Sequence, residues 1–146
     1  MMEYKVVVNE DVILWYKPGT DERHREDGPA IEWNDGDKSW YLNGKYHRED
    51  GPAIENANGY KAWWLNGKRH REDGPAVEYA SGSKHWYLDG KRHREDGPAF
   101  EYADGSKFWY LDGEKLSEAE FNQKMNSCQG KIVEIDGRTY TLTLVK

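Results

Sequence analysis

Apolar and polar residues alternate along two short segments of this chain, and the pair of segments then recurs. The first run, 29–33, ends at Asn34-Asp35-Gly36, and the second, 38–42, ends at Asn43-Gly44. Alternation with a period of two is typical of strands with one buried face. Asp-Gly and Asn-Gly supply the positive φ that tight turns between strands require. We therefore expect one β-hairpin in each unit, with residues 45–51 crossing to the next.

The unit is repeated at a fixed spacing of 23 residues. The segment His-Arg-Glu-Asp-Gly-Pro-Ala occurs four times, beginning at His24, His47, His70 and His93. A Trp and a Leu keep the same step, at Trp40, Trp63, Trp86, Trp109, Leu42, Leu65, Leu88 and Leu111. A single hairpin buries too little apolar surface to stand alone, so neighbouring units must stack. A catalytic centre needs one asymmetric set of groups, so residues repeated in every unit indicate a repeat protein that is not an enzyme.

The two ends of the chain depart from the repeat and are expected to cap it. Ser117 and Glu120 have the spacing of a capping box, which predicts a helix from about 118 to 126. A hairpin turning at Asp136-Gly137 follows, and this tail is expected to seal the C-terminal edge of the sheet, because open edges invite aggregation. The predicted division is an N-terminal capping hairpin, a repeat array and a helix-plus-hairpin cap, at residues 1–23, 24–115 and 116–146.

The predicted fold class is therefore all-β, an elongated antiparallel sheet of stacked hairpin repeats with a short C-terminal helix and a capping hairpin. The assignment of faces follows from the alternation. Ile31 and Trp33, together with Trp40 and Leu42, are expected to be buried. The opposite face then carries an exposed aromatic row beside the repeated glutamates, formed by Tyr41, Trp64, Tyr87 and Tyr110. Tyr and Trp are favoured anchors at protein interfaces, so this row is a candidate binding face, unless the C-terminal helix or a second copy of the chain covers it.

Composition narrows the function classes. Seven Trp and ten Tyr compensate for a hydrophobic content of only 36%, because each aromatic ring buries a large area. The net charge of −6 argues against binding double-stranded nucleic acid or an anionic membrane, which requires a basic excess. Cys128 is the only cysteine, so no intrachain disulfide is expected. We expect a reducing, cytoplasmic location, since neither a signal peptide nor an apolar run long enough to span a membrane is present.

The repeated His-Arg-Glu-Asp segment has two readings. In the first it is structural: the Asp caps the Asp-Gly-Pro turn and the Arg pairs with Glu across units. In the second it forms a rim of donors for a small nucleotide-type ligand, made of His24, Arg25, His47, Arg48, His70, Arg71, His93 and Arg94. Equivalent atoms in adjacent units lie roughly 9–10 Å apart, too far to share one zinc ion. No metal and no cofactor are predicted.

The stretch 86–93, Trp-Tyr-Leu-Asp-Gly-Lys-Arg-His, followed by Gly97 and by 102–107, Tyr-Ala-Asp-Gly-Ser-Lys, resembles the MORN repeat over about residues 13 to 113. MORN units have a short glycine-containing link where this chain has Arg-Glu-Asp-Gly-Pro-Ala. With this different link, the chain resembles the MORN-like variant found in bacterial antitoxin-type proteins and in proteins of large viruses and tailed phages. The resemblance implies stacked hairpins and a non-enzymatic, phage-encoded protein that engages and inhibits a host protein. The alternatives are a sponge for a small nucleotide-type signal and a structural protein that self-associates into homo-oligomers.

Overall fold

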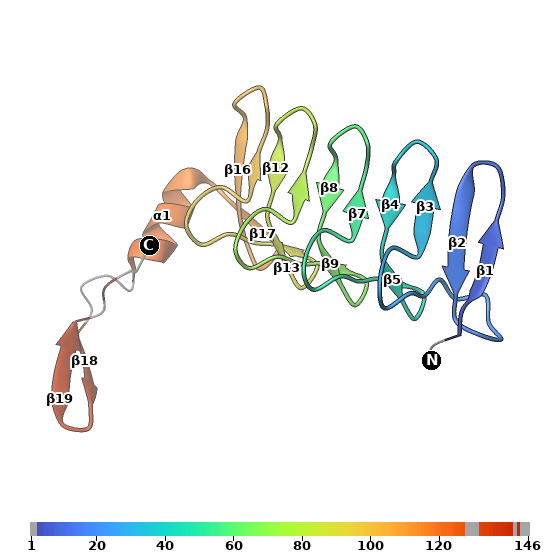
Figure 1. Ribbon diagram of the computed structural model, residues 1–146. Coiled ribbons are helices and arrows are strands. Elements are labelled where there is room, and N and C mark those ends of the chain that lie inside the picture. The colour runs from blue at the N-terminus through green and yellow to red at the C-terminus, as the bar shows by residue number, and fades with distance from the viewer. Residues whose placement is uncertain (1–2, 128–131, 142, 144–146) are drawn as a thin grey trace.

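The computed structural model describes residues 3–127, 132–141 and 143, and its body is one antiparallel sheet of eleven strands. The units lie side by side along this sheet (Figure 1), which confirms the predicted class of stacked hairpin repeats. In spatial order the strands are β1 (Lys5–Val8), β2 (Val12–Tyr16), β3 (Ile31–Trp33), β4 (Lys38–Ser39), β7 (Ile54–Glu55), β8 (Lys61–Ala62), β11 (Val77–Glu78), β12 (Lys84–His85), β15 (Phe100–Glu101), β16 (Lys107–Leu111) and β17 (Glu114–Leu116).

A second row of short hairpins runs beside the main sheet, so the expectation of one hairpin per unit was incomplete. The segment predicted as one strand, 38–42, is interrupted at Trp40, whose N–H donates to the carbonyl of Ala53 in the next unit at 2.8 Å. After a turn with positive φ at Asn43 and Gly44, part of the predicted crossing pairs as a strand. The hairpins of this row are β5 (Tyr41–Leu42) with β6 (Lys45–Tyr46), β9 (Trp64–Leu65) with β10 (Lys68–Arg69), and β13 (Tyr87–Leu88) with β14 (Lys91–Arg92).

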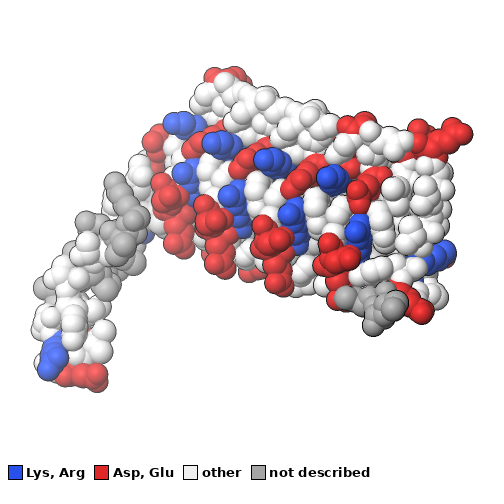
Figure 2. All heavy atoms as spheres, viewed as in Figure 1, with Lys and Arg blue, Asp and Glu red and all other residues white. Residues whose placement is uncertain are grey.

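One side of the main sheet, which we call the charged face, carries alternating glutamates and lysines. Glu32 is paired with Lys38 within a hairpin, and Lys38 is paired with Glu55 of the following unit. The same register recurs through the later units. Opposite charges directly across a strand pair stabilise the pairing. Figure 2 shows the result as bands of basic and acidic side chains that cross the array.

The other side of the sheet, which we call the aromatic face, holds the core. Here the register places Ile31 opposite Ser39, and Val77, Phe100, Tyr87 and Tyr110 form one buried cluster with alanines from the repeats. The sequence-based face assignment, which grouped Ile31 with Trp40, was therefore wrong.

The predicted exposed aromatic row of Tyr41, Trp64, Tyr87 and Tyr110 was wrong for the same reason. Tyr87 and Tyr110 are only 9% and 8% exposed, whereas Trp33, expected in the core, is 39% exposed. Tyr41 and Trp64 are half-buried. Strand pairing puts Ser39 on the same side of the sheet as the buried Ile31. Residue 41 is two positions further along, so its side chain points to that same buried side.

The C-terminal end of the sheet is covered by a helix, as predicted. Helix α1 (Glu118–Asn126) begins at a capping box formed by Ser117 and Glu120. It packs against β16 and β17, with Leu116 and Phe121 buried. In the described residues the hairpin of β18 (Ile132–Ile135) and β19 (Arg138–Thr141) is a separate two-stranded sheet. Among the described residues the helix therefore covers the edge strand, and the part of the predicted C-terminal hairpin beyond residue 141 lies mostly outside them.

Deletion of one complete unit, residues 47–69, is expected to leave a cooperatively folding protein. The new junction repeats one that already exists, because each unit contacts only its neighbours. The denaturant dependence of the free energy of unfolding should fall, since less surface is buried on folding. Urea titrations followed by circular dichroism measure both quantities.

The matched control deletes half a unit, residues 47–58, which removes β7. Strands β4 and β8 both pair antiparallel with β7, so they run in the same direction and cannot replace its pairing. Cooperative unfolding of the half-unit deletion with wild-type stability would contradict the repeat architecture.

Candidate binding face

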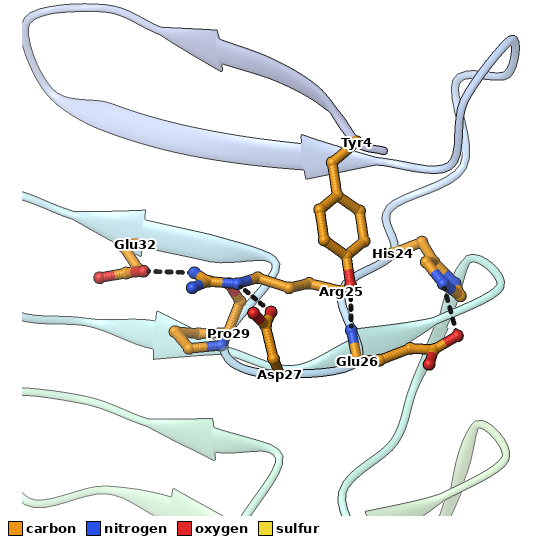
Figure 3. A network of polar contacts seen from close by, with 7 residues as sticks. All are labelled: Tyr4, His24, Arg25, Glu26, Asp27, Pro29 and Glu32. Carbon is orange, nitrogen blue, oxygen red and sulfur yellow. Dashed lines mark hydrogen bonds and ion pairs between the residues drawn. The ribbon is translucent and has the colours of Figure 1, made fainter. Parts of the chain in front are cut away.

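The four copies of the His-Arg-Glu-Asp segment build four similar polar networks, the first of which is drawn in Figure 3. Arg25 Nη1 donates to Glu32 Oε1 at 2.9 Å and to the carbonyl of Pro29 at 3.2 Å, while its Nε donates to Asp27 Oδ1 at 2.9 Å. Each later unit repeats the set around Arg48, Arg71 and Arg94. Each arginine therefore has two carboxylates of its own unit as partners.

The contact that crosses between units is a cation–π stack. The guanidinium carbon of Arg48 lies 4.0 Å from the ring centre of Trp40 in the preceding unit. Arg25, Arg71 and Arg94 lie at 3.9–4.1 Å over Trp15, Trp63 and Trp86. The prediction that Arg pairs with Glu across units was wrong. The Arg–Glu salt bridge lies within one unit, and the arginine contacts the preceding unit through its stack on tryptophan.

The glycine of the segment leaves room for the folded-back arginine. A Cβ on Gly28 would lie 2.8 Å from the guanidinium carbon of Arg25, and one on Gly51 would lie 2.9 Å from that of Arg48. A side chain at these two positions would force the guanidinium to shift. The sequence showed that this glycine recurs, but only the structure shows that the arginine folds back over it.

The repeated histidines hold the turns of the second row of hairpins. His24 Nδ1 accepts the backbone N–H of Asn43 at 3.0 Å, and Asn43 is a turn residue with a φ of 49°. His47, His70 and His93 accept in the same way from Asn66, Asp89 and Asp112. Acceptance at Nδ1 requires the tautomer with its proton on Nε2. In His24 that nitrogen lies 3.5 Å from the Glu26 carboxylate.

These contacts support the structural reading of His47, Arg48, His70, Arg71, His93 and Arg94. Arg48 lowers the pKa of Asp50, mainly through its hydrogen bond, and Arg71 does the same for Asp73. Cations already neutralised by two carboxylates attract a nucleotide phosphate only weakly. The part of the chain that the structure describes contains no group of His, Cys, Asp and Glu side chains suited to a metal ion.

A different set of cations lies on the aromatic face. We call it the cation row, and it consists of the basic residues at the position before each repeated histidine and after the last unit: Arg23, Arg69, Arg92 and Lys115. The second unit has Tyr46 there instead. Among the described residues no acidic side chain forms an ion pair with any member of this row.

Aromatic rings support the cation row. The guanidinium of Arg69 lies 5.1 Å from the ring centre of Trp64 and 5.3 Å from that of Tyr87. Arg92 lies 5.1 Å from Phe100 and 5.0 Å from Tyr110, and its Nη1 donates to the Tyr110 hydroxyl at 3.2 Å. Trp64, Tyr87 and Tyr110, predicted as direct contacts for a partner, thus position the arginines from beneath.

His85 lies within this face, in a position that Ser39, Ala62 and Phe108 occupy in the other units. Its ring stacks on Phe100 at 3.9 Å between centres. The edges of Tyr79 and Tyr102 approach it at 5.0 and 5.1 Å. Burial lowers the pKa of His85, and the nearby charges of Arg69 and Arg92 lower it further.

Sequence reasoning missed this site because it followed only the repeated positions. Arg69, His85 and Arg92 occupy positions at which the units differ, so they stand out only when the face assignment is known. The usable signal was the basic residue directly before His70 and His93.

Substitution of Arg71 by Ala is expected to lower the free energy of unfolding by about 2–3 kcal/mol, because a half-buried Glu78 loses its charged partner and Trp63 loses its stack. Urea denaturation at neutral pH measures the change. The control is Lys84→Ala, an exposed cation of the charged face, which should cost no more than about 1 kcal/mol. Equal effects of the two substitutions would show that the arginine network does not hold the units together.

His85 should make stability depend on pH. Its pKa is lowered in the folded protein from an ordinary value of 6.5, so the unfolded chain binds the proton more readily. The free energy of unfolding of the wild type should not be reduced by His85 above pH 6.5. Below pH 6.5 it should decline as the unfolded chain takes up the proton, until the pH passes the lower pKa of the folded state. In His85→Phe, which keeps the ring stack, this part of the decline should be absent. Urea midpoints between pH 7.5 and 5 test it, and parallel curves for the two proteins would contradict it.

A scan against protein-family models, a search of the curated proteins and a search of the solved structures each found no match to this chain. No helix among the described residues is long and apolar enough to cross a membrane. The aromatic face with its cation row is therefore identified from geometry and charge alone.

Proposed function

We propose that this chain is a non-enzymatic binding scaffold that presents its aromatic face to a protein partner. In line with its resemblance to MORN-like proteins of phages and of antitoxin type, we place the partner among host proteins of the cytoplasm. Binding is proposed to inhibit that partner.

The observation that carries the proposal is the contrast between two sets of arginines. The arginines of the repeated segment are each neutralised by two carboxylates, whereas Arg69 and Arg92 have rings around them and no acidic partner among the described residues. Tyr79 and Tyr102 flank His85 on the same face, and each is 38% exposed. Arg and Tyr are the side chains that contribute most at the centres of protein interfaces.

The nucleotide-sponge alternative receives less support. Its proposed donors, including Arg48 and Arg71, are engaged in networks within the units. A small ligand also binds best in a concave pocket that encloses most of its surface. The hollow that includes Tyr60 and Tyr79, of about 470 Å³, is open to solvent and is lined by no member of the cation row.

Replacing Tyr79 and Tyr102 together by Ala is expected to abolish capture of the partner. Both side chains are exposed, so the fold should be retained, while the loss of two interface anchors at about 2 kcal/mol each weakens binding by roughly a hundredfold or more. Partners captured from a bacterial lysate on the immobilised chain are identified by mass spectrometry. Each is then purified and titrated by calorimetry.

The matched control is Trp33→Ala. Trp33 occupies the equivalent position in the first unit and is similarly exposed, but the basic residue before the next unit is replaced there by Tyr46. The control should bind like the wild type. Undiminished binding by the Tyr79 and Tyr102 double variant would refute the aromatic face as the interface.

A further inference from the structure

We propose that the aromatic face binds an extended, acidic polypeptide segment whose carboxylates, three residues apart, reach Arg69 and Arg92. This inference rests on the proposed function and specifies the part of the partner that the face recognises. Four features carry it: buried donors without an acceptor in the fold, the lack of an ion-pair partner for Arg69 and Arg92 among the described residues, covered ring faces, and the spacing between units.

Three buried polar atoms lack a hydrogen-bond partner in the described structure, and all three lie on this face. They are Trp64 Nε1, Arg69 Nε and His85 Nε2. The His85 side chain belongs to a residue that is only 8% exposed, so water reaches it poorly. Buried polar groups are nearly always paired, and an unpaired one is costly. No acceptor within the described fold therefore offsets the charge of Arg69 at its buried Nε.

The charge of the face favours an anionic ligand. Arg69 is half-buried and Arg92 exposed, and both act on His85 as neighbouring positive charges. On the charged face, by contrast, the arginines are neutralised. Each repeated arginine lies 2.7–2.9 Å from the carboxylate of the Asp two residues later in the chain. Partners with complementary charge associate faster and in a defined orientation.

The rings are arranged for carboxylates and not for nucleobases. A nucleobase binds single-strand sites by stacking on a free aromatic ring face. Here Arg69 lies over Trp64, Arg92 lies over Tyr110, and His85 stacks on Phe100. Beside the exposed Tyr79 and Tyr102, the groups left for a ligand are the edges of the guanidinium planes, which suit carboxylate oxygens through paired hydrogen bonds.

The spacing of the arginines selects an extended segment. Arg69 and Arg92 occupy the same position in successive units, and the backbone N–H of Gly90 donates to the carbonyl of Arg69 at 2.9 Å, which ties the two hairpins together. Two strands span about 9–10 Å. A polyproline II chain rises about 3.1 Å per residue with three residues per turn, so every third side chain recurs on one side after about 9 Å.

A third cation extends the row along the array. Lys115 continues the cation row into the next unit beside Phe108, at 4.8 Å from its ring centre. The face therefore offers three successive cations to a segment that carries an acidic residue at every third position.

The test uses the full chain and a fluorescein-labelled peptide of repeated Glu-Pro-Pro triplets, with binding followed by fluorescence anisotropy. The expected result is binding at least about tenfold tighter than to a peptide of the same composition with its glutamates clustered at one end. A Lys-Pro-Pro peptide and an oligothymidine should bind more weakly still. Oligothymidine binding tighter than the Glu-Pro-Pro peptide would overturn the proposal in favour of a nucleic-acid ligand.

The variant Arg69→Gln with Arg92→Gln should weaken peptide binding by about tenfold or more. Its control is Lys68→Gln with Lys91→Gln, which removes the same charge from the adjacent, exposed positions of the same strands and should change binding by less than about twofold. Arg92→Gln alone, at an exposed position, serves if the double variant unfolds. Equal binding by the arginine and lysine variants would overturn the proposal.

The two proposals fail in different ways. If Tyr79 and Tyr102 are needed to capture a protein but no Glu-Pro-Pro peptide binds, the acidic segment is refuted and the protein interface stands. If the peptide binds through Arg69 and Arg92 but no protein from the lysate depends on Tyr79 and Tyr102, the proposed protein-binding function is refuted.

Discussion

The stacking of each repeated arginine on the tryptophan of the preceding unit is the contact on which the array depends. The main-sheet hairpins of the first three repeats have strands of only two or three residues, too short to be stable alone. Arg48 spans the junction: it lies over Trp40 and is fixed by Asp50 and Glu55 of its own unit. With its carboxylate partners, the guanidinium buries much of a ring that would otherwise face water. Because every junction repeats this contact, the array extends by adding identical interfaces.

The repeated positions of the sequence predicted the fold class correctly. The role of the variable positions could not be predicted, because it depends on which face of the sheet they occupy. The period of 23 residues, the turns at Asn-Gly and Asp-Gly, and the capping box at Ser117 led to the correct fold class and helix. The face assignment failed in the register between the two strands of each hairpin, because Ile31 lies opposite Ser39 and so does not share a side with Trp40. This offset of one residue reversed the prediction for Tyr87 and Tyr110. The register of pairing, which sequence alone does not give, decides such cases.

The division between repeated and variable positions also separates stability from binding. A residue present in every unit, such as His47 or Arg48, is committed to holding a turn or a junction. Specific recognition needs at least one feature that the other units lack, and His85 is such a feature. A histidine there in place of Ser, Ala or Phe puts a polar nitrogen among rings, where burial and two arginines disfavour its charged form. A buried nitrogen without a partner is expected where a position serves function and not only packing.

The acidic net charge of −6 does not conflict with an anionic ligand, because screening makes the interaction local. At physiological ionic strength, charges further than about 8 Å apart are largely screened. The exposed carboxylates of the repeated segment, such as Glu72 and Asp73, belong to the opposite side of the sheet from the cation row. They would repel an acidic segment from that side, while Arg69 and Arg92 attract it on the aromatic face at short range. The overall charge then restricts the ligand to one face, and the strength of binding should depend on how closely its carboxylates approach the two guanidinium groups.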